Sequence, residues 1–183
     1  PARNGVTTDL PALPNGGNTF STRINNQGVV VGRAINAGGE TRAVMWKDGA
    51  IVDLGTLPGD TSSAATGIND LGQVVGVSSA TGRPSRGFIW SNGVMSELTG
   101  FAADLNVNPA AINNAGLVTG VAAGVAEDSG VGAAEGFERA PSRSFSFIMC
   151  PSAGRALCSS LTRSTVTSGA MPFPWIEVPF GVK

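Results

Sequence analysis

The chain has 183 residues, of which 42% are hydrophobic and 14% are charged, a composition typical of one globular domain and not of a disordered chain. Its net charge is −1 and it has no cluster of lysine and arginine, which argues against nucleic acid and anionic membranes as partners. No hydrophobic run approaches the ~20 residues of a membrane-spanning helix. Histidine and tyrosine are both absent, so a Ser-His-Asp triad, a Cys-His pair and a zinc site built on imidazole are excluded.

The 26 glycines, about twice ordinary usage, accompany many valine, isoleucine and threonine residues and predict short strands joined by tight turns. A unit of 44 residues recurs: "TRINNQGVVVG" ends at Gly32, "TGINDLGQVVG" at Gly76 and "AAINNAGLVTG" at Gly120. Trp46 and Trp90 keep the same interval, and we expect them to fill the space between adjacent units. A register kept across a whole unit is typical of a structural repeat.

The second unit, taken in chain order, predicts four strands. Alternation over residues 64–68 predicts the first strand, and "NDLG" turns the chain into a second strand over 73–79. After the loop "ATGRPS" we expect a third strand over 86–90, then a tight Asn-Gly turn and a fourth strand over 94–98. The expected fold class is therefore all-β, with one four-stranded antiparallel sheet of the β-propeller-blade type in each unit.

The third unit departs from this pattern after Gly120. "SFSFIM" (residues 144–149) can be aligned with "SRGFIW" (residues 85–90) when about 15 residues are inserted, and "GRALCSSL" is a weaker counterpart of "GVMSEL". We therefore expect three segments. Residues 1–123 hold two to two and a half repeats, near 9–52, 53–98 and 99–123. Residues 124–142 form an acidic insertion rich in glycine and alanine, and residues 143–183 form degenerate last-blade strands plus a proline-rich tail.

Three blades make too tight a ring to close within one chain. Either several chains assemble one ring or the chain is an open fragment. We expect a partial propeller that is completed by homo-oligomerisation, because exposed sheet edges and uncovered faces favour association.

A polar pair recurs in the turn that follows the first strand of each unit: Asn25-Asn26, Asn69-Asp70 and Asn113-Asn114. The simpler interpretation is that the first asparagine caps backbone N–H groups of the turn, which a left-handed glycine then completes. The alternative is that Asn26, Asp70 and Asn114 converge around an axis and hold a hard cation such as Ca²⁺, which prefers amide and carboxylate oxygens.

Other charged residues offer further candidate sites. Asp60 has no counterpart in the first unit, which makes it a candidate catalytic carboxylate, although an exposed loop position is the simpler interpretation. Arg42 and Arg86 precede the third strand of their units and are candidates for binding a ligand's carboxylate or phosphate, or are simply surface strand residues. The repeated acids Asp9, Asp53 and Glu97 are expected to accept hydrogen bonds from the backbone.

The sequence from Asp53 to Leu98, "DLGTLPGDTSSAATGINDLGQVVGVSS…RGFIWSNGVMSEL", resembles the HAF repeat family of bacterial proteins, and residues 9–52 form a looser copy. The family pattern combines D-L-G-x-L-G-G, I-N-x-x-G-x-V-V-G and an aromatic strand ending in Trp before an N-G turn. This chain departs from it where His-Ala-Phe is expected, with Arg-Ala-Val at 42–44 and Arg-Gly-Phe at 86–88. The resemblance implies a propeller-like fold and an exported, extracellular or periplasmic location, and it implies no particular activity.

Cys150 and Cys158 are the only cysteines. In an exported protein they are candidates for a disulfide that closes a short loop, and free thiols are the alternative. A catalytic thiolate has little support because the chain contains no histidine.

Two functions are compatible with these features. The first is a non-catalytic binding or assembly module that associates with itself and presents its loops to a small-molecule ligand. The second is a calcium-assisted hydrolase of esters, lactones or phosphotriesters, in which an axial cation polarises the substrate and a carboxylate activates water. In the second case Asn26, Asp70 and Asn114 would be the metal ligands and Asp60 the candidate carboxylate.

Overall fold

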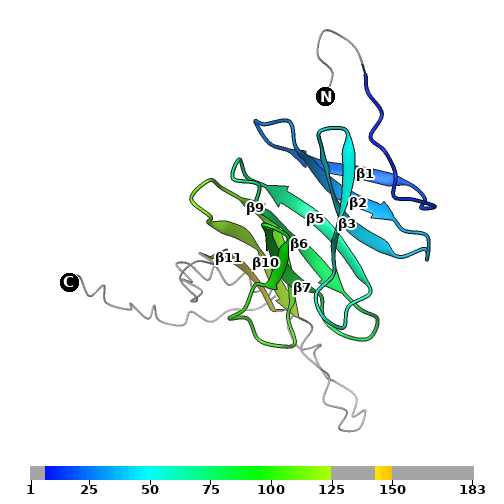
Figure 1. The fold of residues 1–183 in the computed structure, drawn as a ribbon. Helices are drawn as coiled ribbons and strands as arrows, with labels where there is room; N and C mark the ends of the chain where they lie inside the picture. Colours follow the sequence, from blue (N-terminus) through cyan, green and yellow to red (C-terminus); the bar gives the residue numbers. More distant parts are fainter. Residues whose placement is uncertain (1–6, 125–142, 150–183) are drawn as a thin grey trace, which may run out of the picture.

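The computed structural model describes residues 7–124 and 143–149, and these form eleven strands without a helix (Figure 1). The first sheet contains, in this order, β1 (Thr19–Ile24), β2 (Val30–Ile35), β3 (Thr41–Lys47) and β4 (Ala50–Gly55). The second contains β5 (Ser62–Ile68), β6 (Val74–Ser79), β7 (Arg86–Ser91) and β8 (Val94–Glu97). The third contains β9 (Asn106–Ile112), β10 (Val118–Gly124) and β11 (Arg143–Met149). The all-β prediction is confirmed, and no described segment is a helix that could cross a membrane.

Each sheet is an antiparallel meander, and its hairpins form where the sequence predicts turns. Asp48 and Gly49 join β3 to β4 with φ values of 51° and 80°, and Asn92 and Gly93 join β7 to β8 with 51° and 86°. Two consecutive positive φ values define a type I′ turn, whose twist matches that of the flanking strands. The predicted Asn-Gly turn of the second unit is therefore confirmed.

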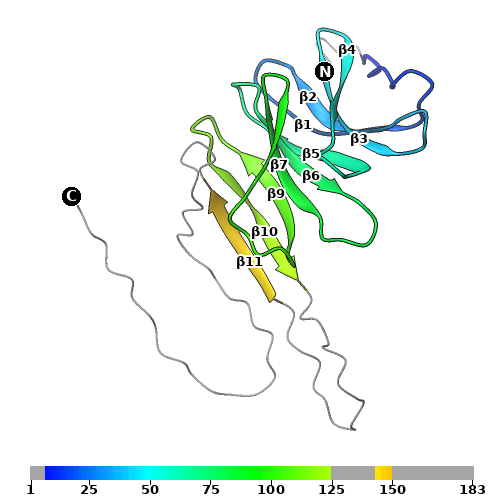
Figure 2. The same ribbon diagram turned by 60° about the horizontal axis from the view of Figure 1, so that its bottom comes forward.

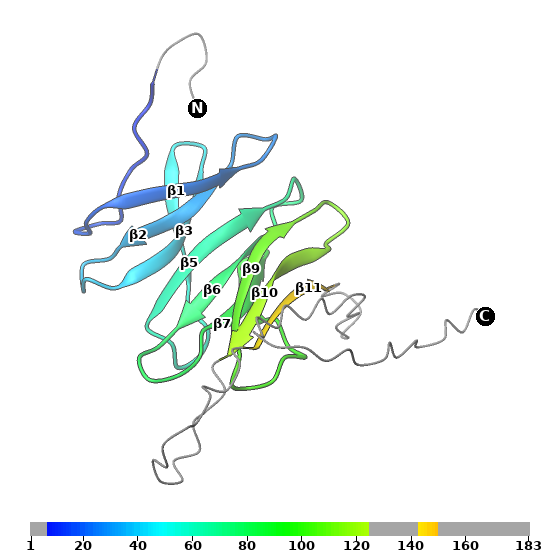
Figure 3. The ribbon, with the colours of Figure 1, turned by 180° about the vertical axis from the view of Figure 1, so that it is seen from behind.

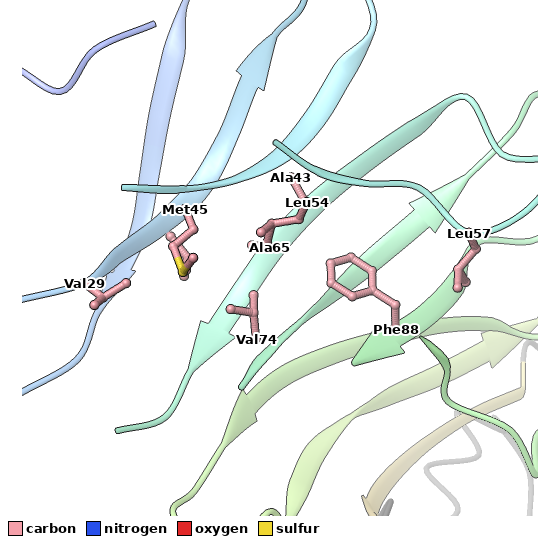
Figure 4. Packing of buried hydrophobic residues seen from close by; sticks show 9 residues of the cluster. Val29, Ala43, Met45, Leu54, Leu57, Ala65, Val74 and Phe88 are labelled. Atoms are coloured by element: carbon pink, nitrogen blue, oxygen red, sulfur yellow. The ribbon is translucent and has the colours of Figure 1, made fainter. Parts of the chain in front are cut away.

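The three sheets follow one another across the molecule in chain order and pack face to face (Figures 2 and 3). Hydrophobic side chains fill the space between the first two sheets (Figure 4): Val29, Val31, Ala43, Met45, Leu54, Leu57, Ala65, Val74 and Phe88. A second core lies between the second and third sheets: Val75, Leu98, Val107, Ile112, Val118, Ala122, Phe147 and Met149. The second sheet is thus buried on both faces.

The two tryptophans occupy equivalent strand positions but meet different neighbours. Trp90 packs against the core between the first two sheets, as expected. Trp46 instead lies on the face of the first sheet that points away from the second, where Leu10 and Leu13 cover it and its Nε1 donates to the Pro11 carbonyl at 2.8 Å. The expectation that a neighbouring sheet covers Trp46 is therefore wrong for the described residues, because the segment before β1 takes that place.

The glycine that ends each repeated motif permits a close approach between strands. A Cβ atom on Gly76 would overlap the Ala64 carbonyl oxygen and lie 2.7 Å from Cζ of Phe88. Gly32 and Gly120 face the equivalent carbonyl oxygens of β1 and β9. Since any side chain would collide with backbone here, the recurring glycine is explained by packing.

The register of β11 matches the alignment expected for the third unit. Met149 pairs with Val118 as Trp90 pairs with Val74 in the second sheet. The strand therefore keeps its repeat position despite the longer connection that precedes it. The expectations for the insertion and for the tail, including Cys150 and Cys158, lie outside the described residues.

Candidate functional site

The turns between the first and second strands of the sheets are built around the repeated asparagines. Oδ1 of Asn69 accepts hydrogen bonds from the backbone N–H groups of Leu71 at 3.1 Å and Gln73 at 2.9 Å, and Gly72 follows with a φ of 77°. Asn25 and Asn113 cap their own turns through the same two positions. The turn-capping interpretation is thus confirmed in all three units.

The side-chain amides of these asparagines also connect one sheet to the next. Nδ2 of Asn25 donates to the Asn69 carbonyl at 3.1 Å, and Nδ2 of Asn69 donates to the Asn113 carbonyl at 2.9 Å. Asn25 and Asn69 therefore each cap their own turn with the side-chain oxygen and donate to the following sheet with the side-chain nitrogen. We call this row of three residues the asparagine ladder.

The three candidate metal ligands lie together beside the asparagine ladder. Oδ1 of Asp70 accepts from the Asn26 backbone N–H at 2.9 Å, and its Oδ2 accepts from the side-chain amides of Asn26 at 2.8 Å and Asn114 at 3.0 Å. The Asp70 N–H donates in turn to Oδ1 of Asn114 at 2.9 Å. The three positions of the alternative, cation-binding interpretation therefore do lie together, but as a hydrogen-bonded bridge between the three sheets.

This bridge does not fit a calcium site. Calcium requires several oxygen ligands, most of them carboxylates or carbonyls directed at the ion. Here Asp70 is the only acid, and both of its oxygens already face N–H groups, whose positive ends would repel a cation. The described residues also contain no cluster of three or more acids, cysteines or histidines suited to a metal.

The hydrogen bonds to Asp70 lower the pKa of its carboxyl, with the Asn114 amide as the largest cause and the Asn26 amide and N–H next. A lowered pKa means that the carboxylate stabilises the fold above the unfolded pKa of about 3.9 and that this contribution is lost as the pH falls below it. We expect Asp70→Asn to lower the melting temperature near pH 7 and to lower it much less near pH 3. Thermal unfolding at the two pH values measures the difference.

Asp48→Asn is the matched control, because it removes the same charge from an exposed hairpin turn where no described residue donates a hydrogen bond to the carboxylate. This variant is expected to melt like the parent protein at both pH values. If Asp70→Asn lowered the melting temperature by the same amount at both pH values, the negative charge of Asp70 would not contribute to stability.

Asp60 lies in a second polar cluster and is not exposed. Its side chain is only 1% exposed, and its two oxygens contact Arg83 at 2.7 Å and Arg86 at 2.8 Å. The simpler sequence interpretation, an exposed loop aspartate, is therefore wrong. Arg83 also donates to the Gly59 carbonyl and Arg86 to that of Pro58 at 2.9 Å, so the two arginines fasten the loop before β5. The buried Asp60 carboxylate, together with the two arginines, therefore fixes the position of this loop.

Arg42 and Arg86 both contact an acid of the neighbouring strand. Arg86 Nη1 lies 2.7 Å from Oε2 of Glu97, and Arg42 Nε lies 3.6 Å from Oδ2 of Asp53, one unit earlier. Burial alone would lower the pKa of Arg86, but its hydrogen bonds and charge interactions with Asp60 and Glu97 outweigh burial and raise it. Both arginines thus contact carboxylates of the chain itself, and the binding of a ligand by either one stays a prediction.

The repeated acids differ in what they accept. Asp53 accepts a hydrogen bond from the Gly55 N–H at 2.8 Å, as expected. Among the described residues, Glu97 accepts from Arg86 instead of from the backbone. Sequence reasoning missed Arg83, and the signal available was its place in the loop "ATGRPS", where the first unit has Gly39 instead.

Both clusters hold parts of the fold together. The asparagine ladder and the Asp70 bridge join the three sheets, and the Asp60 cluster fixes a loop onto β7. In the part of the chain that the structure describes, neither cluster pairs a nucleophile with a base. Comparison with models of protein families, with curated proteins and with solved structures gave no match.

Proposed function

We propose that the chain is a non-catalytic assembly and binding module of the propeller type, whose copies associate head to tail through the outer faces of the sheet stack. The observation that carries this proposal is an apolar face on the third sheet. Leu117, Val121 and Ile148 are 38%, 40% and 44% exposed there. They alternate along the strands with the buried residues that face the second sheet, so they point the opposite way. We call this the last outer face.

The residues at the equivalent positions of the earlier units are covered by the following sheet. Val29 and Met45, two units before Leu117 and Ile148, are buried in the core between the first and second sheets. Ile89, the counterpart of Ile148 in the second sheet, packs against the core shared with the third. The last outer face therefore carries apolar side chains at the positions that a further sheet covers in the earlier units.

The first sheet has a complementary outer face. Ile24 is 52% exposed, while its counterparts Ile68 and Ile112 pack against the sheet that precedes theirs. We call the uncovered region around Ile24 the first outer face. Residues 10–13 cover Trp46 on this same face, so a second copy docks here only when that segment moves aside. A second copy whose first outer face then lay on the last outer face would bury Ile24 and Ile148 as the internal interfaces bury their counterparts. It would also extend the asparagine ladder, with Nδ2 of Asn113 donating to the carbonyl of Asn25 in the second copy.

The head-to-tail arrangement is tested with two variants, Ile24→Glu and Ile148→Glu, by light scattering coupled to gel filtration. We expect the parent protein to form oligomers whose mass rises with concentration and each variant alone to be monomeric. A mixture of the two variants is expected to form dimers, since each contributes one intact face. Leu71→Glu, at an exposed turn tip, is the control and should associate like the parent protein.

Two results would contradict the proposal. A parent protein that stays monomeric at every concentration would exclude self-association. Association of Ile24→Glu alone would show that two last outer faces meet each other, which is a different assembly with isologous contacts.

The relationship to the HAF repeat family and an exported location remain part of this proposal, and they rest on the motif between Asp53 and Leu98. The calcium-assisted hydrolase is the less supported function, because the Asp70 bridge does not fit the ion. Its test is hydrolysis of an activated ester or phosphotriester before and after chelation. Activity that chelation removes and calcium restores would favour that function over the assembly module.

A further inference from the structure

A cleft of about 450 Å³ opens between the first and second sheets, at the end of the strands away from the asparagine ladder. Phe20, Arg33 and Thr41 line it from the first sheet, and Ser62, Val77 and Ser79 line it from the second. Its volume is within the range of small-molecule sites in proteins, but the cleft is open to solvent: Arg33 is exposed and Phe20 is 47% exposed. None of its lining residues is acidic.

The cleft exists because the repeat is broken at this place. Between the second and third sheets, the backbone N–H and Oγ of Ser85 donate to Oδ1 of Asn106 at 2.9 and 3.1 Å, and the Val107 N–H donates to the Ser85 carbonyl. Thr41 and Ser62 stand at the positions of Ser85 and Asn106 one unit earlier. The serine side chain is shorter than that of asparagine, and no hydrogen bond joins this pair. The first two sheets are joined one residue beyond Ser62, where the Ala43 N–H donates to Oγ of Ser63 at 2.9 Å, and the space beside Thr41 and Ser62 remains open.

Arg33 is the cation of the cleft, and its position is held by an aromatic ring. Its guanidinium carbon lies 4.8 Å from the centre of the Phe20 ring, a cation–π distance. Among the described residues, Arg42, Arg83 and Arg86 each contact a carboxylate, whereas Arg33 has no ion pair and its guanidinium donates no hydrogen bond. The stacked guanidinium thus keeps its planar set of N–H donors available to a ligand.

We propose that this cleft binds a small organic carboxylate with a compact apolar body. The guanidinium of Arg33 pairs with the carboxylate in the planar geometry that arginine favours. The hydroxyl groups of Ser62 and Ser79 supply further hydrogen bonds, while Phe20 and Val77 contact the apolar body. This apolar lining favours an organic acid over inorganic phosphate, which has no surface to bury there.

The site concerns the binding role of the module and depends on no contact between copies. A failure of carboxylate binding would leave the head-to-tail assembly unaffected, and a monomeric protein would leave the cleft unaffected. The two proposals are therefore tested separately.

The experiment is calorimetric titration of the full chain with phenylacetate, phenylacetamide and inorganic phosphate. For a ligand of this size we expect phenylacetate to bind with a Kd of about 1 mM or below. The neutral amide and phosphate are expected to bind at least about tenfold more weakly, because the amide lacks the charge and phosphate lacks the apolar body. Equal binding of phenylacetate and its amide, stronger binding of phosphate, or no binding of any of the three would overturn the proposal.

Three variants locate the site. Arg33→Gln is expected to weaken phenylacetate binding at least about tenfold. Arg23→Gln, on an exposed position of β1 outside the cleft, should leave the Kd unchanged. Ser62→Asn copies the asparagine that closes the next gap and is expected to abolish binding without unfolding the protein. Unchanged binding by both Arg33→Gln and Ser62→Asn would place the ligand elsewhere and overturn the proposal.

Discussion

Replacing Phe88 by alanine is expected to destabilise the protein by about 3–5 kcal/mol, the usual cost of removing a buried phenylalanine. The Phe88 ring is completely buried between the first and second sheets, beside the core residues Leu54 and Val74 (Figure 4). It also lies against Gly76, where only a glycine leaves room for it. The variant would therefore create a cavity that neither rigid sheet can fill. Urea unfolding followed by tryptophan fluorescence measures the loss.

Phe20→Ala is the matched control for this variant. It removes the same side chain from a strand of the same stack, but at a position that is 47% exposed. We expect it to cost about 1 kcal/mol or less, since little surface is uncovered and no closed cavity forms. Equal losses for Phe88→Ala and Phe20→Ala would mean that the space between the sheets is not a packed core.

The strands and turns were predictable because their signals are local and recur. Alternating apolar residues and the Asn-Gly turns specify a hairpin within a few residues, and the interval of 44 residues carries each assignment to the next unit. The interval also predicted that Asn26, Asp70 and Asn114 would meet, since equivalent positions of stacked units lie side by side. The chemistry of the place where these residues meet was harder to predict, because the geometry of each turn decides whether an oxygen faces a cation or an N–H group.

The surroundings of Asp60 could not be predicted from the repeat, and those of Trp46 only in part. Asp60 is buried by Arg83 and Arg86, which lie more than 20 residues further along the chain, and the first unit has Gly39 in place of Arg83. Trp46 occupies the same strand position as Trp90, but the segment around Pro11 covers it instead of a sheet. Leu10 and Leu13, by contrast, stand one interval before Leu54 and Leu57 of the core that Trp90 contacts, so this part of the covering of Trp46 does follow the repeat.

Replacing Asn69 by alanine is expected to cost about 2–4 kcal/mol, because it removes a buried side chain that accepts from two backbone N–H groups of a partly buried turn and donates to the Asn113 carbonyl. Asn69 is only 3% exposed, and its side chain makes four hydrogen bonds that shape its own turn and reach the Asn113 carbonyl. Asn113→Ala removes the same cap from an exposed turn in the third unit, where water can replace the lost acceptor. We expect it to cost about 1 kcal/mol. Chemical unfolding of both variants measures the difference.

A second substitution separates the two roles of the asparagine ladder. Asn69→Asp keeps the oxygen that caps the turn but replaces the donor that holds the Asn113 carbonyl with a second acceptor. If the ladder couples the sheets, hydrogen exchange in β9 and β10 becomes faster in this variant while β2 and β3 keep their protection, since the lost bond joins only the second and third sheets. Unchanged exchange in β9 and β10 would mean that the asparagines serve their turns alone. The packing of hydrophobic side chains would then be sufficient to hold the stack together.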